Sequence, residues 1–234
     1  MSTSLSRSLI WLTLAEVLFN ISGYVIHAVA GRVLGPADYG RYALVVTLTT
    51  TIIILIGNGI PTAMSRYLSE YFEKDHRMVG TIKHVGARLQ FFLIGGVTLL
   101  FFAISPLIAQ LLGDPSLTPL FALSSLIIPT FAASSFYFYY FTGIHHFRTQ
   151  AALKMTRAIL RIVLIVSLVF AFGIYGAIAG YILVPLCTFL LGYVLDRKSS
   201  AAFRASATNT TEDPFHWKLL PTSSSPTTLF LLFY

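Results

Sequence analysis

The sequence predicts an all-α integral membrane protein with six transmembrane helices, on three observations. Hydrophobic residues make up 56% of the 234 residues and charged residues only 11%, whereas about 25% of a soluble domain is charged. The apolar residues fall into six runs, each close to the roughly 20 residues that a membrane-spanning helix needs. The basic residues lie mostly between these runs and gather on one side of the expected membrane.

The six expected helices are separated by three short turns and two longer polar segments. Glycine, proline and aspartate mark the turns, at residues 31–41, 113–116 and 173–176. Residues 65–88 are expected to form a charged amphipathic connector, and residues 143–154 a polar and basic one. The expected helices are 8–30, 42–64, 89–112, 117–142, 156–172 and 177–195.

We therefore expect three parts along the chain. Residues 1–195 form the six-helix transmembrane lobe, and residues 196–218, rich in Ser, Thr and Ala, form a cytoplasmic linker. Residues 219–234 are apolar again but contain two prolines and three serines, so they predict only a partial seventh helix. Residues 28–30, Ala-Val-Ala, resemble a signal-peptidase site, but the apolar run before them is too long for a cleaved leader.

Basic residues set the expected orientation. Fourteen of the 16 lysines and arginines lie in segments on one side of the membrane, and only Arg32 and Arg41 lie on the other. Basic residues are enriched on the cytoplasmic side of membrane proteins. The sequence thus predicts a multi-pass protein of the cell membrane with its N-terminus in the cytoplasm. The same bias explains the net charge of +7 without a nucleic-acid partner.

Polar residues within the first two expected helices recur at helical spacing, which places them on one face of each helix. They are Glu16, Asn20, Gly23 and His27 in the first helix, and Thr47, Thr51, Asn58 and Thr62 in the second. Two such faces predict either a hydrated cavity or a seam of hydrogen bonds between the helices. The residues expected to line the cavity are Glu16, Asn20, His27, Thr51 and Asn58. Glu16 should avoid lipid in either case, because a charge at the bilayer centre costs about 2.5–3.5 kcal/mol.

The sequence contains no recognisable catalytic or metal-binding pattern. It has no phosphate-binding loop and no Cys/His metal spacing, its only cysteine is Cys187, and its outer turns are short. We therefore expect no enzyme activity and no cofactor or metal site. The aromatic run 136–141 is expected to be a belt at the membrane interface, or alternatively a surface on which sugars stack.

A motif near the N-terminus carries a family resemblance. Residues 34–42, LGPADYGRY, are followed by an apolar helix and then by residues 65–71, SRYLSEY. In order and spacing this resembles the first turn and second helix of polysaccharide-transport proteins, the oligosaccharide flippases of the multidrug/oligosaccharidyl-lipid/polysaccharide exporter superfamily. Such proteins have twelve to fourteen helices in two six-helix lobes around a central cavity. The resemblance implies that this chain is one lobe of a two-lobe transporter, a truncated fragment that is inactive unless a second lobe or a second copy joins it.

The resemblance also implies a function, the movement of polyprenyl-linked oligosaccharides across the membrane by alternating access. The cargo would carry a lipid pyrophosphate, a group that arginine binds well. Four arginines on the expected cytoplasmic rim are therefore expected to bind this headgroup close to the membrane lipids, or else to be simple topological anchors. They are Arg66, Arg88, Arg157 and Arg161.

Three other functions stay open from the sequence. The first is a cation-coupled multidrug exporter of the same superfamily, in which Glu16 would suit a cation or proton site. The second is a membrane enzyme of cell-surface glycan assembly, which the short outer turns disfavour because they leave little room for a loop site. The third is a membrane scaffold that transports nothing.

Overall fold

The computed structural model describes residues 2–56, 58–72 and 76–208, and the elements within these ranges are helical. Residues up to Asp196 form one compact unit and residues from Arg197 a second; the account below concerns the first. A 3₁₀ turn, Pro115–Leu117, precedes α4. The helices are α1 (Ser2–Ile56), α2 (Gly59–Tyr71), α3 (His76–Leu111), α4 (Thr118–Ser124), α5 (Ile127–Gly143) and α6 (Phe147–Thr208).

Four stretches of the described residues are long and apolar enough to cross a membrane. They are Thr13–Tyr71, Met78–Leu111, Pro115–Gly143 and Phe147–Arg197. The first is 59 residues long and the last 51, about two and a half to three times what a single crossing requires. The prediction of an all-helical, multi-pass membrane protein is confirmed.

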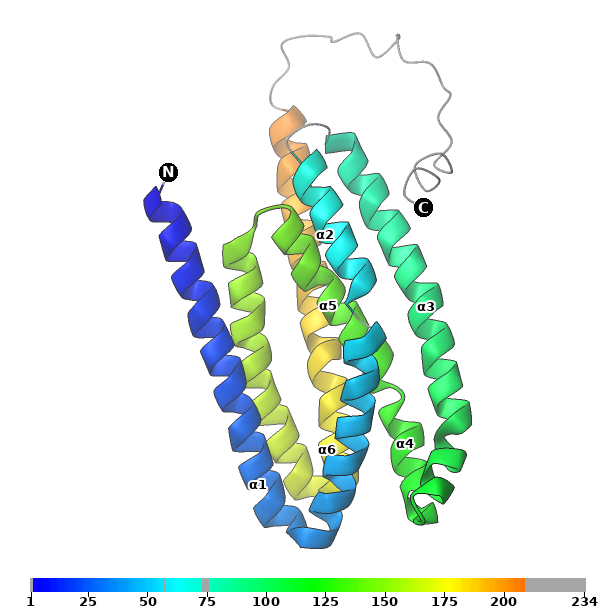
Figure 1. The fold of residues 1–234 in the computed structure, drawn as a ribbon. Helices are drawn as coiled ribbons and strands as arrows, with labels where there is room; N and C mark the ends of the chain where they lie inside the picture. Colours follow the sequence, from blue (N-terminus) through cyan, green and yellow to red (C-terminus); the bar gives the residue numbers. More distant parts are fainter. Residues whose placement is uncertain (1, 57, 73–75, 209–234) are drawn as a thin grey trace. The chain divides into compact units, whose positions relative to one another are not determined.

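Each of the two longest helices is divided by a glycine. Gly35 has φ 73° and ψ 173°, and Gly173 has φ 57° and ψ −133°, conformations that residues with a Cβ avoid. Figure 1 shows α1 and α6 each turning back on themselves at these positions. We therefore call residues 2–34 and 36–56 the first and second legs of α1, and residues 147–172 and 174–196 those of α6. Both glycines lie in turns that the sequence predicted.

Polar contacts hold the turn of α1 to the end of α3. The Arg41 side chain donates to Asp114 at 3.0 Å and lies 3.5 Å from Asp38. Hydrogen bonds from Ser116, together with the nearby Arg41 guanidinium, lower the pKa of the Asp114 carboxyl. At this end of the unit Arg41 therefore balances the charge of both Asp38 and Asp114 in part.

Three apolar clusters fill the interior. One joins the second leg of α1 to α3, α4, α5 and α6, with Phe101, Phe121 and Ile178 at its centre. A second joins both legs of α1 to α6 around Ile26 and Tyr42. The outer surface also carries large apolar side chains, which is typical of a protein that faces lipid.

The third cluster corrects the interpretation of the aromatic run 136–141. Its members are buried except for Tyr139, which is half-buried. They pack against Leu68 of α2 and Phe189 of α6, so these two helices cover the rings. The run is therefore neither a lipid-facing belt nor an accessible surface for sugars, because the neighbours that bury it are distant in sequence.

Several expected boundaries also differ. The predicted connector 65–88 is largely helical, since α2 ends at Tyr71 and α3 begins at His76. The predicted helix 117–142 is interrupted between α4 and α5. Helix α6 begins at Phe147 and continues to Thr208, through the first part of the predicted linker 196–218. The predicted partial helix 219–234 lies outside the described residues.

Candidate functional site

The residues expected to line a cavity lie mainly on the outside of this unit. Glu16, Asn20 and His27 are exposed on the first leg of α1, Thr51 is exposed on the second leg, and Asn58 is half-buried before α2. Asn20 donates to the backbone oxygen of Glu16 at 3.0 Å. Within the unit Glu16, Asn20, His27 and Thr51 are therefore exposed polar side chains of α1, a set that we call the polar face, and they do not enclose a cavity by themselves.

Glu16 has a partner on another helix. Its carboxylate forms an ion pair with Lys154 on the first leg of α6. The two side chains are 51% and 31% exposed, so in water such a pair would contribute about 0–1 kcal/mol to stability. The pair neutralises Glu16 and fixes the register between the first legs of α1 and α6.

Lys154 begins a row of cations that we call the cation stripe, made of Lys154, Arg157 and Arg161. Residues at i, i+3 and i+7 share one helix face. On α1, Glu16, Phe19 and Gly23 have the same spacing and contact the stripe. A Cβ at Gly23 would lie 3.5 Å from Arg161 Nη1. The two legs therefore meet along a seam that carries three cations from α6 and one carboxylate from α1.

Arg157 is the most deeply buried member of the stripe, with 8% of its surface exposed. Its guanidinium lies 4.6 Å from the ring centre of Phe131, and 5.6 Å from those of Phe19 and Phe138. Within the described part of the chain it has no ion-pair or hydrogen-bond partner. Each cation–π contact contributes about 0.5–2 kcal/mol, whereas burying an ion costs several kcal/mol. The rings thus offset only part of the cost of this buried charge.

Arg161 continues the stripe into a chain of tyrosines. It donates to the Tyr181 hydroxyl at 3.2 Å, and its guanidinium lies 4.9 Å from the Phe19 ring. The Tyr42 hydroxyl also donates to Tyr181 at 3.2 Å. Tyr42 is fully buried and its ring lies 5.9 Å from that of His27. A polar path therefore runs from the two arginines through both legs of α1 and α6.

Arg157 and Arg161 lie well inside α6 and not at its start. Because α6 begins at Phe147, these residues lie about 15 and 21 Å along the helix at 1.5 Å per residue. They face the interior, whereas Arg66 on α2 and Arg88 on α3 are exposed. Of the four arginines expected on one rim, two therefore face the interior and two are exposed. The predicted helix began near residue 156 because residues 143–154 are polar. In the structure Ala151 and Leu153 are nevertheless buried.

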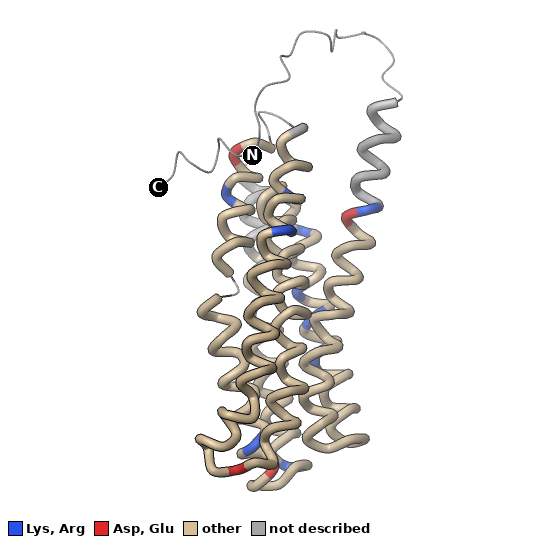
Figure 2. Tube along the Cα trace, turned by 90° about the vertical axis from the view of Figure 1, so that its right-hand side faces the viewer, with Lys and Arg blue, Asp and Glu red and all other residues tan. Residues whose placement is uncertain are grey.

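The distribution of charged residues points to the same region, the first leg of α6. Figure 2 shows basic positions along the middle of the helices as well as near their ends. A separate ion pair, Lys83 with Asp196, joins α3 to α6. Sequence reasoning missed the roles of Lys154, Tyr42 and Tyr181. The spacing of Lys154, Arg157 and Arg161 was a usable signal, but the tyrosine contacts depend on the turns at Gly35 and Gly173.

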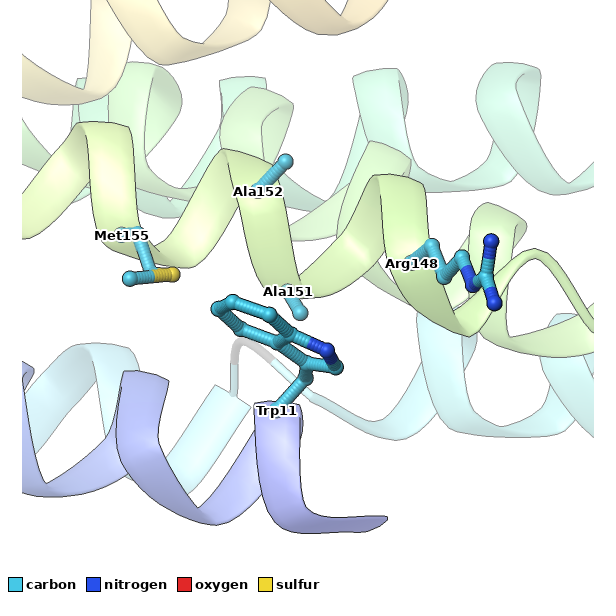
Figure 3. A pocket seen from close by; sticks show the side chains of 5 residues that line it. All are labelled: Trp11, Arg148, Ala151, Ala152 and Met155. Carbon is cyan, nitrogen blue, oxygen red and sulfur yellow. The ribbon is translucent and has the colours of Figure 1, made fainter. Parts of the chain in front are cut away.

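An open groove of about 500 Å³ lies in the seam near the start of α6. Figure 3 shows Trp11 of α1 facing Ala151 and Met155 of α6, with Arg148 at one end. The groove is thus mainly apolar with a cation at its edge. No group of three or more His, Cys, Asp or Glu side chains suited to a metal ion occurs among the residues that the structure describes.

Comparison with solved structures shows the fold of MATE transporters. A MATE crystal structure in the bent conformation superposes with a TM-score of 0.74 at 15% identity, over 83% of this chain and 45% of that one. The Vibrio cholerae MATE transporter VcmN in the bent form gives 0.59 at 18% identity, over 86% and 47%. The chain therefore spans about half the length of these structures.

A third structure is described as having a binding pocket of reversed polarity, which suggests a different function. It is a transporter of the MOP superfamily from Pyrococcus furiosus, with a TM-score of 0.68 at 13% identity, over 82% of this chain and 45% of that one. No curated protein matches the sequence. These likenesses, all below 20% identity, establish the fold alone.

The sequence itself matches a family model. The model describes polysaccharide biosynthesis proteins and covers residues 5–215, which includes both legs of α1, the cation stripe and the motif at residues 34–42. The chain is therefore a multi-pass membrane protein that belongs to the polysaccharide biosynthesis protein family.

Proposed function

We propose that the chain forms one lobe of a transporter that moves lipid-linked oligosaccharides across the cell membrane by alternating access. The observation that carries the proposal is the polar face of α1, where Glu16, Asn20, His27 and Thr51 are exposed on a unit whose surface is otherwise rich in apolar side chains. Amide, imidazole and hydroxyl groups suit a cargo rich in hydroxyls. The family match supports a role in polysaccharide synthesis.

The proposal includes a topology of six crossings. The two legs of α1, the helix α3, the α4–α5 stretch and the two legs of α6 would each span the bilayer once. The 14-to-2 distribution of basic residues supports an N-terminus in the cytoplasm. Gly35 and Gly173 would then lie at the outer surface.

The polar face needs a partner other than lipid. A charged residue such as Glu16 at membrane depth costs about 2.5–3.5 kcal/mol, and unsatisfied amides add to this cost. A second lobe, or a second copy of this chain, would cover the face and create the cavity between lobes in which transporters bind their cargo. The length of the matched structures, about twice that of this chain, supports the same arrangement.

The geometry favours this function over a cation-coupled multidrug exporter. The acid that would bind a cation or proton, Glu16, is already paired with Lys154. The interior around Arg157 and Arg161 carries an excess of positive charge, which repels a cationic drug. The Pyrococcus furiosus transporter with reversed pocket polarity supports the idea that this fold accommodates pockets of either sign.

A complementation experiment tests the proposal. Cells that lack their oligosaccharide flippase would express the chain together with a second lobe from a related protein, and surface glycan would be measured. We expect glycan to be restored by the pair and not by the chain alone. Resistance to cationic drugs without any glycan would favour the multidrug exporter, and glycan restored by the chain alone would favour a homodimer.

A further inference from the structure

We infer that the groove at the start of α6 binds an anionic phospholipid of the surrounding bilayer, as a resident lipid between the first legs of α1 and α6. The groove is lined by Trp11, Arg148, Ala151, Ala152 and Met155. Its volume of about 500 Å³ falls within the range of roughly 300–1,000 Å³ that is typical of small-ligand sites. The inference uses the six-crossing topology proposed above, but it concerns a lipid of the membrane and not the transported cargo.

The depth of the groove matches the headgroup region of a bilayer. Arg148 lies 25 residues before the turn at Gly173, and Trp11 lies 24 residues before the turn at Gly35. At 1.5 Å per residue these stretches are about 36–38 Å long, whereas the hydrocarbon core is about 30 Å thick. With both turns at the outer surface, Trp11 and Arg148 therefore lie at the opposite surface of the membrane, where lipid headgroups are.

Polarity changes along the groove as it does along a phospholipid. Arg148, the second residue of α6, lies at one end, as Figure 3 shows. Ala152 and Met155 lie about 6 and 10 Å further along the helix, at the level of the acyl chains. The small side chain of Ala152 leaves the hollow, and Met155 and the Trp11 ring form its apolar walls. A lipid therefore fits with its headgroup at Arg148 and the start of one acyl chain beside Ala152 and Met155.

The cation at the end of the groove has no partner within the lobe. Arg148 is exposed, and no carboxylate of the residues that the structure describes forms an ion pair with it. Lys154, the next cation along α6, is neutralised by Glu16. An anionic headgroup would balance the charge of Arg148, whose N–H donors match phosphate oxygens. The indole N–H of Trp11 is a further donor, and tryptophan is enriched at this level of membrane proteins.

The headgroup decides which lipid the groove prefers. Acyl chains are surrounded by apolar groups in the bilayer as well as in the groove, so the chains give little preference for either. Phosphatidylglycerol and phosphatidylcholine both carry a phosphate, but only the first has a net negative charge. A basic residue at the membrane surface favours anionic lipid by about fivefold. We therefore expect the groove to prefer phosphatidylglycerol over phosphatidylcholine by about fivefold.

Quenching of Trp11 fluorescence by brominated lipids tests the site. The chain has two tryptophans, so the full chain with Trp217→Phe reports on Trp11 alone. It would be reconstituted into equal mixtures of phosphatidylglycerol and phosphatidylcholine, with bromine on the acyl chains of one lipid or the other. The fivefold preference should fall below about twofold in Arg148→Gln. The control Arg32→Gln removes the same charge from the other end of the first leg of α1 and should leave the preference unchanged.

A second pair of variants tests the hollow without changing any charge. Ala152→Phe fills the groove, so the lipid should lose its place beside Trp11 and the preference should again fall below about twofold. Ala103→Phe is the matched control, because Ala103 is exposed on α3 and does not line the groove. A preference that survives Ala152→Phe would mean that Arg148 attracts anionic lipid to the surface without a site, and it would overturn the inference.

The remaining outcomes separate the resident lipid from the cargo. Equal quenching by the two lipids before any groove substitution, or a preference that Arg148→Gln leaves intact, would also contradict the inference. Displacement of phosphatidylglycerol by one tenth as much polyprenyl phosphate would assign the groove to the cargo and overturn the resident lipid. A chain that prefers phosphatidylglycerol here but restores no glycan with a second lobe would refute the proposed function and leave this site standing.

Discussion

Two regions of this lobe combine buried cations with aromatic rings, and they differ in their charge balance. Around Lys83, the ammonium lies 4.5 Å from the Tyr140 ring centre and pairs with Asp196, whose side chain is 8% exposed. Around Arg157, three rings surround the guanidinium but no carboxylate pairs with it among the described residues. The charges of the first cluster balance, whereas the second cluster carries an excess of positive charge.

The difference indicates that the first cluster maintains the fold, whereas the second buries positive charge that the lobe does not balance. Both partners of the Lys83–Asp196 pair are supplied by helices of the lobe, so the pair ties α3 to α6 whenever the chain is folded. The cation stripe receives one carboxylate for three cations, so the free energy of burying the other two is not recovered within the lobe. Four predictions test this contrast, in order of expected effect.

The largest expected effect on stability is at the cluster around Lys83 and Asp196, whose charges balance. Asp196→Ala leaves the part-buried Lys83 without its partner, and breaking a buried pair in this way costs about 3 kcal/mol. We expect the free energy of unfolding, measured by denaturant titration in detergent micelles, to fall by that amount. The double variant Asp196→Ala with Lys83→Met should recover part of the loss. A loss that the second substitution does not reduce would show that the pair is not the cause.

The next effect concerns the turn that assembles the seam. Gly173→Ala forces a Cβ into a backbone conformation that costs about 2 kcal/mol, and it should displace Tyr181 from Arg161. The free energy of unfolding, measured by denaturant titration in detergent micelles, should fall. Gly95→Ala is the matched control, because a Cβ there meets nothing within 4 Å and alanine favours a helix by about 0.5–1 kcal/mol. Equal effects of the two substitutions would argue against a special role for the turn.

The third prediction is a substitution that does not lower the free energy of unfolding. Arg157→Met removes an unpaired buried charge and leaves an apolar side chain among three rings, so the unfolding free energy should stay the same or rise by about 1 kcal/mol. The same titration in micelles measures the stability. A decrease of several kcal/mol would mean that the stripe supports the fold and that the contrast between the two clusters is wrong.

The smallest expected effect on stability is at the exposed end of the seam. Glu16→Gln breaks a part-exposed pair with Lys154, so the unfolding free energy should change by less than about 1 kcal/mol. Transport in the two-lobe assay should nevertheless fall, because the polar face loses its only acid, while the amount of inserted protein stays constant. Asp38→Asn, at the exposed pair with Arg41, is the control. Full transport by Glu16→Gln would make Glu16 a seam residue only.

The sequence by itself determined the class of this protein and the positions of its turns. Composition and the lengths of the apolar runs are sufficient to predict a helical membrane protein, because lipid cannot satisfy backbone polar groups and so requires continuous helices. Gly35 and Gly173 were predicted as turns since glycine tolerates positive φ. The motif at residues 34–42 pointed to the family that the whole-chain match then established.

Only the tertiary structure decided which polar residues lie inside. Helical spacing predicts that residues share a face, but not what that face meets. Glu16, Asn20 and His27 share a face that is exposed in this lobe, whereas Arg157 and Arg161 share one that packs against Phe19 and Tyr181. The aromatic run 136–141 is buried for the same reason, by helices distant in sequence. Burial is a property of the neighbours that the fold brings together, and the turns at Gly35 and Gly173 bring them together here.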